Sequence, residues 1–91
     1  EEVHFRLNFV QQEPPPVADY AVILVYSTSH AISAERALGR AGLDAKLIPT
    51  PRHLSSDCGM AVRILAEDQS AGRQALEAAG VPFERIETLD R

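Results

Sequence analysis

The spacing of hydrophobic and polar residues changes along the chain, and each spacing predicts a different secondary-structure element. Residues 20–26 form an unbroken apolar run rich in β-branched side chains, which is typical of a central strand buried on both faces. A short strand is expected over 43–48 and a second central strand over 59–65. Residues 82–89 predict a last strand, with Phe83 and Ile86 as core candidates. The body of the chain therefore contains four strands.

Two segments between these strands place small and apolar residues at helical spacing. The first spans 31–41, and the second opens with Glu67-Asp68, acidic residues that the positive end of a helix dipole favours. The residues at this spacing are Ala34, Ala37, Leu38 and Ala41 in the first helix, and the apolar positions of the second include Ala71, Ala75, Leu76 and Ala79. The hydroxyls of residues 27–29 are candidate N-caps, and Gly42 and Gly80 are expected to end the helices.

The resulting order, β-α-β-β-α-β, predicts an α+β fold of the ferredoxin-like kind, a sandwich of two helices on an antiparallel sheet. Right-handed crossovers give the strand order 4-1-3-2. In this topology the turn after the first strand, with residues 28–30, lies at the same end of the sheet as the loop with residues 52–58. The turn over 80–82 reaches that end as well. We therefore expect the chemically capable residues to share one end of the sheet.

A separate segment precedes this body. Val3, Phe5, Leu7 and Phe9 alternate with polar residues, which predicts an extended arm or strand over 1–13. Three consecutive prolines then mark a stiff linker over 14–18. The domain itself is expected over 19–91. Because the chain opens with Glu rather than Met, we expect a piece of a longer protein or a processed chain.

The length and net charge of the chain argue against several classes of function. The 91 residues predict one small domain. The net charge is −4 and no run of Lys or Arg occurs, which argues against a nucleic-acid surface, although a local basic spot surrounds Arg52. No apolar run approaches the roughly 20 residues that cross a bilayer, so no membrane partner is expected. A lone cysteine favours a reducing cytoplasm.

That cysteine, Cys58, is the centre of the candidate chemistry. One interpretation is a buried small hydrophobe, common for a free cysteine. In the other, Arg52, His53 and the N-terminus of the first helix stabilise a thiolate, while Asp57 opposes it. Gly59 would let a partner approach the backbone closely.

Two further site types are weaker alternatives. His30, His53 and Cys58 form an acceptable zinc set, but no tight ligand spacing supports a metal, and solvated loop histidines are favoured. Either histidine could serve as base to a nucleophilic Cys58. Hydrolysis would also need a cleft and an oxyanion hole, which a domain of this size hardly offers. A carrier is therefore favoured over a turnover enzyme, and no cofactor is expected.

The motifs themselves are similar to a known family. Leu47-Ile48-Pro49-Thr50-Pro51-Arg52 and Leu54-Ser55-Ser56-Asp57-Cys58-Gly59, with Tyr26-Ser27-Thr28, Ala34-Glu35 and Ala61-Val62-Arg63, resemble the putative selenium/sulfur carrier protein-like family, small bacterial domains of unproven function. The resemblance covers about 19–89. It implies that Cys58 carries sulfur or selenium as a persulfide or perselenide, with Arg52, Asp57 and Gly59 in the surrounding motif. The implied partners are a donor such as a cysteine desulfurase and an acceptor protein.

A single thiol suits such a carrier, because a second cysteine would displace the sulfur by forming a disulfide. The alternative is a non-catalytic interaction or regulatory module that dimerises or binds a partner through a sheet edge, to which the arm of residues 1–13 adds as a strand. The two hypotheses are compatible within one protein.

Overall fold

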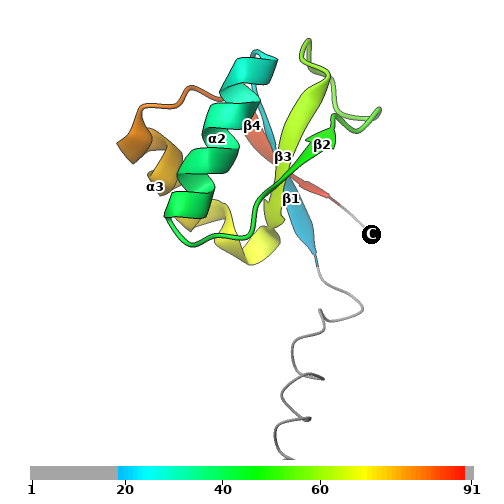
Figure 1. Ribbon diagram of the computed structural model, residues 1–91. Helices are drawn as coiled ribbons and strands as arrows, with labels where there is room; N and C mark the ends of the chain where they lie inside the picture. The colour runs from blue at the N-terminus through cyan, green and yellow to red at the C-terminus, as the bar shows by residue number, and fades with distance from the viewer. Residues whose placement is uncertain (1–18, 90–91) are drawn as a thin grey trace, which may run out of the picture.

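The apolar run that opens the body of the chain forms β1 (Tyr20–Leu24), a strand inside a four-stranded sheet. This computed structural model describes residues 19–89 (Figure 1). After β1 the elements are α2 (Thr28–Arg40), β2 (Lys46–Pro49), β3 (Met60–Leu65), the 3₁₀ turn η1 (Ala66–Asp68), α3 (Gln69–Ala79) and β4 (Arg85–Leu89). The expected arm and linker over 1–18 lie outside the described residues.

The strands lie in the order β2-β3-β1-β4, with every neighbouring pair antiparallel. This is the predicted order 4-1-3-2 counted from the opposite edge, so the α+β, ferredoxin-like fold is confirmed. Helices α2 and α3 lie together on one face of the sheet (Figure 1). Their packing against that face forms the larger part of the core.

Alternation along β1 sends side chains to both faces of the sheet. Ala21, Ile23 and Val25 join the core under the helices, while Val22 and Leu24 face the other way. All five are fully buried, which explains why the run is apolar without interruption. On the face opposite α2 and α3, the cover over the buried residues comes partly from a loop and from strands: among residues 19–89 the half-buried hydrophobics there are Ile48, Leu54 and Leu89.

Local signals set the helix ends. The Ser27 hydroxyl accepts a hydrogen bond from the His30 amide at 3.2 Å, so α2 begins at Thr28, earlier than the predicted start at 31. At its other end Gly42 has φ +84°, and the Leu43 amide donates to the Leu38 carbonyl at 3.0 Å. Because Leu43 belongs to this Schellman turn, it is not part of β2, which begins at Lys46 rather than at the predicted residue 43.

Not every apolar position of the two helices is buried. Ala41, Ala71 and Ala79 are exposed, and the buried line of α3 runs through Gly72 and Leu76. A Cβ at position 72 would lie 3.2 Å from Ile64 Cδ1 and 3.4 Å from Leu38 Cδ2. The helix therefore approaches the sheet and α2 so closely that a glycine occupies the contact, a position that an apolar pattern does not mark.

Candidate functional site

Three connections meet at one end of the sheet. Because β1 and β2 both run antiparallel to β3, their final residues, Leu24 and Pro49, lie at the same end. The turn between β1 and α2, the loop between β2 and β3 and the segment that leads into β4 therefore gather there, at the top of Figure 1. This is the end that the sequence predicted, and Cys58 lies on the middle connection.

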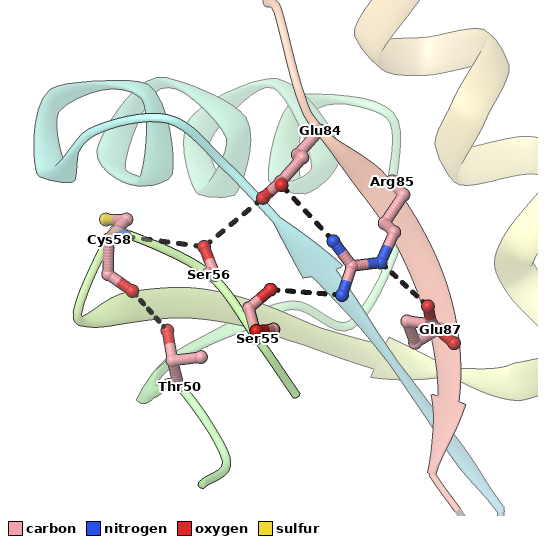
Figure 2. Close-up of polar contacts among 7 residues, drawn as sticks. All are labelled: Thr50, Ser55, Ser56, Cys58, Glu84, Arg85 and Glu87. Atoms are coloured by element: carbon pink, nitrogen blue, oxygen red, sulfur yellow. Dashed lines mark hydrogen bonds and ion pairs between the residues drawn. The ribbon is translucent and has the colours of Figure 1, made fainter. Parts of the chain in front are cut away.

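Residues 50–59, called the cysteine loop below, close at their base. The last ladder pair of β2 and β3 is Pro49 with Met60, and the Thr50 amide adds a bond to the Gly59 carbonyl at 2.9 Å. The Thr50 hydroxyl also donates to the Cys58 carbonyl at 2.8 Å (Figure 2). Two bonds from one residue thus fix the two peptide groups on either side of the Gly59 Cα.

The thiol of Cys58 points into the protein. Cys58 is 6% exposed and belongs to the same buried cluster as Ala31 of α2. Its sulfur accepts a hydrogen bond from the Met60 amide at 3.5 Å, and its own amide donates to the Ser56 hydroxyl at 3.3 Å. In this conformation the residue packs as a small hydrophobe, and the thiol is covered rather than presented to a partner.

A second set of polar contacts joins the tip of the cysteine loop to the start of β4. The Ser56 hydroxyl donates to Glu84 Oε1 at 3.2 Å, and Arg85 Nη2 donates to the Ser55 carbonyl at 3.1 Å. Arg85 also pairs with Glu84 Oε2 at 3.2 Å and with Glu87 Oε2 at 2.7 Å. Figure 2 shows the guanidinium between the two carboxylates and the loop. Ser55, Ser56, Glu84, Arg85 and Glu87 are called the β4 clasp below.

The charged residues expected around the thiol lie further out. Arg52, His53 and Asp57 are exposed. Gly59 is exposed as well, its φ is not positive, and an added Cβ would meet no atom within 4 Å. The contacts to Cys58 come instead from the backbone of Met60 and from hydroxyl groups. The approach of a partner to the backbone at Gly59 stays a prediction.

Residues 19–87 match the family model described as putative Se/S carrier protein-like. The chain belongs to this family. It matches none of the curated proteins and none of the solved structures with which it was compared. The matched stretch runs from β1 into β4, so the family's pattern includes the whole cysteine loop and both acidic residues of the clasp.

His30 is the other chemically capable residue at this end of the family domain. It is half-buried in the first turn of α2, and its ring meets the Tyr26 ring edge-on, with centroids 6.3 Å apart. Its Nδ1 is buried and has no hydrogen-bond partner among residues 19–89. Tyr26 itself is 58% exposed. The pair lies at the start of α2, at the same end of the sheet as the cysteine loop.

The structure does not group the three candidate zinc ligands into a metal site. Within the described part of the chain, no group of three or more His, Cys, Asp or Glu side chains gathers to hold a metal ion, and His30, His53 and Cys58 are therefore not such a group. None of the helices in residues 19–89 has both the length and the apolar character needed to span a membrane.

Three contributors to the site were missed in the sequence: Glu84, Arg85 and Glu87. Thr50 and Ser56 lay within the motif stretches that carried the family resemblance, but without a role of their own. Hydroxyl and charged residues in loops usually contact water, so their types carry little signal. The available signal was topological. The segment before the last strand was expected at the cysteine end of the sheet, and Glu84 and Arg85 follow directly on that turn.

Proposed function

We propose that this chain carries sulfur or selenium as a persulfide or perselenide on Cys58. Membership of the Se/S carrier-like family supports the cargo. The observation that carries the assignment to a residue is that Cys58 is the chain's one cysteine and lies on the loop at the end of the sheet where three connections meet. A persulfide on this protein therefore has a single attachment point, and no resolving thiol within the chain can displace it.

The loading step exchanges one sulfur–sulfur bond for another. The Cys58 thiolate attacks the outer sulfur of a donor's persulfide, a new bond forms between that sulfur and Sγ, and the donor's cysteine leaves as a thiolate. Unloading repeats the exchange: a nucleophile of the acceptor attacks the outer sulfur, and the Cys58 thiolate leaves. No net oxidation or reduction occurs, so the carrier needs no redox cofactor. Selenium follows the same scheme through a perselenide.

Individual residues have distinct parts in this proposal. The Met60 amide already donates to Sγ, and a donor in that place favours negative charge on the sulfur that attacks or leaves. The N-terminus of α2 lies at the same end of the sheet, where its partial positive charge favours an anion. Gly59 leaves room for the partner's backbone. The exposed Arg52 and Asp57 contact the donor or acceptor protein.

Burial of the thiol fits this role once the cysteine loop can open. An outer sulfur held under the loop is shielded from the free thiols of a reducing cytoplasm, the compartment in which we place the protein. Transfer then requires a partner, or thermal motion, to bring Cys58 to the surface. Loops with few buried contacts are the regions where such local opening takes place.

The test is to incubate the purified chain with a cysteine desulfurase and cysteine, or with a selenocysteine lyase and selenocysteine. Intact-mass spectrometry is expected to show the addition of one sulfur or selenium atom that a reductant removes. The Cys58→Ser variant provides the control and should gain nothing. Absence of the adduct on a folded wild-type chain, under conditions where the denatured chain reacts fully with iodoacetamide, would contradict the proposal.

The second candidate is an interaction or regulatory module. It is favoured by the open sheet, whose outer strands β2 and β4 each have one unpaired edge among the described residues. In this proposal the arm of residues 1–13 adds to an edge and brings two copies together. Deleting residues 1–13 should then convert a dimer into a monomer, as judged from the molar mass measured by light scattering, whereas Cys58→Ser should leave the dimer intact. A dimer that persists after the deletion would rule out the arm as the link.

A further inference from the structure

We infer that the β4 clasp controls access to Cys58 by setting how often the cysteine loop opens, an inference that rests on the proposed function for its biological role. Glu84 and Arg85 act as positioning residues, since neither touches the thiol. They hold Ser55 and Ser56, the loop residues shortly before Cys58. The prediction concerns a local opening of the loop while the sheet and helices stay folded.

The contacts form a continuous connection from the thiol-bearing residue to the edge strand. The Cys58 amide donates to the Ser56 hydroxyl at 3.3 Å, and the same hydroxyl donates to Glu84 Oε1 at 3.2 Å. The other oxygen of Glu84 pairs with Arg85, which holds the Ser55 carbonyl at 3.1 Å. A loop that swings away must therefore break both links to β4 together, which makes closure a cooperative state rather than a set of separate contacts.

The surroundings of Arg85 direct its charge toward the loop. Its neighbour across the ladder is Leu24, which is fully buried and apolar. On β3, which β1 separates from β4, the cation Arg63 lies over the Tyr20 ring at 4.2 Å from its centroid. The polar partners that the structure shows for the Arg85 guanidinium are the two carboxylates of its own segment and the Ser55 carbonyl.

The clasp is weak enough to open. The side chains of Glu84 and Arg85 are 32% and 36% exposed, and ion pairs at such exposure are screened by water and salt. The Leu54 contact with the sheet and the two bonds of Thr50 hold the loop in addition. Removal of the clasp should therefore shift the opening equilibrium by a modest factor, about threefold to tenfold, without unfolding the domain.

The test measures the rate at which excess iodoacetamide alkylates Cys58 in the folded full chain. The variants Ser56→Ala and Arg85→Met should react about threefold to tenfold faster than wild type. Ser56→Thr, which keeps the hydroxyl, should react at the wild-type rate. Arg40→Met is the matched control: Arg40 is exposed in the last turn of α2, whose first turn lies at the cysteine end, and its loss should leave the rate unchanged.

Two further measurements separate the clasp from general destabilisation. Added salt should accelerate alkylation of wild type but not of Arg85→Met, because only the former retains the ion pairs. The rate should depend weakly on urea, since local opening exposes little surface. Unchanged rates in both Ser56→Ala and Arg85→Met, or a urea dependence equal to that of global unfolding, would overturn the inference.

Donor-dependent loading distinguishes this inference from the proposed function. If the clasp variants alkylate faster and also load sulfur faster from a desulfurase, both proposals are supported. If alkylation responds to the clasp but wild type never accepts sulfur, the carrier function fails and the control of access stands. If wild type loads sulfur while the clasp variants alkylate at its rate, the carrier stands and the clasp is overturned.

Discussion

The Thr50 hydroxyl donates a 2.8 Å hydrogen bond to the Cys58 carbonyl, which joins the end of strand β2 to the residue that carries the thiol. The Thr50 amide simultaneously bonds the Gly59 carbonyl. The backbone around Cys58 is thus tied to the rigid sheet, whereas the tip of the loop depends on the clasp.

Replacement of Thr50 by valine removes this hydroxyl while it keeps the side-chain shape. The variant should lose about 0.5–1.5 kcal/mol of unfolding free energy, because the Cys58 carbonyl loses a part-buried bond. Cys58 should also react faster with iodoacetamide. Urea unfolding and alkylation rates measure the two effects, and Thr50→Ser should restore both. Wild-type behaviour of Thr50→Val would show that the bond does not hold the loop.

Gly59→Ala separates access by a protein from access by a small molecule. An added Cβ meets nothing within 4 Å, so the free energy of unfolding should change by no more than about 0.5 kcal/mol. Alkylation by iodoacetamide should be unchanged as well. Sulfur transfer from a desulfurase should become slower, because the methyl group occupies space that the partner's backbone would use. Equal transfer rates would show that no close approach takes place at this residue.

Two glycines in helices should respond oppositely to a larger side chain. Gly39 in α2 has open space around it, so Gly39→Ala should stabilise the domain by up to about 1 kcal/mol through helix propensity. Gly72 in α3 faces Ile64 and Leu38 closely, and Gly72→Leu should destabilise by about 1–3 kcal/mol through overpacking. Chemical denaturation measures both. A stabilising effect of Gly72→Leu would mean that α3 packs more loosely than described.

Leu54 covers part of the sheet face opposite α2 and α3. It is half-buried against Val22, Leu24 and Ala61, so Leu54→Ala should lower the unfolding free energy by about 1–2 kcal/mol. Cys58 should become more reactive in the same variant, since Leu54 belongs to the cysteine loop. Leu54→Met, which preserves apolar volume, should have a much smaller effect on both. A stability equal to wild type in Leu54→Ala would show that the loop does not shield this face.

The secondary structure followed from local signals to a large extent. Interactions between residues close in sequence can be predicted from the sequence pattern. Examples are the apolar run of β1, the Ser27 cap and the glycines at 42 and 80. The strand order could also be predicted, because handed crossovers leave few arrangements of these elements. Helix faces were less predictable: the close contact at Gly72 replaced Ala71 in the core.

The sequence by itself determined that one thiol, in a polar loop at a particular end of an α+β sheet, carries the candidate chemistry. Only the tertiary structure decided that this thiol is covered, that Arg52, His53 and Asp57 point to solvent, and that Glu84 and Arg85 hold the loop. The physical reason is distance along the chain. The bond between Ser56 and Glu84 joins residues 28 positions apart, and it exists because β4 pairs beside β1, a contact that no local periodicity encodes.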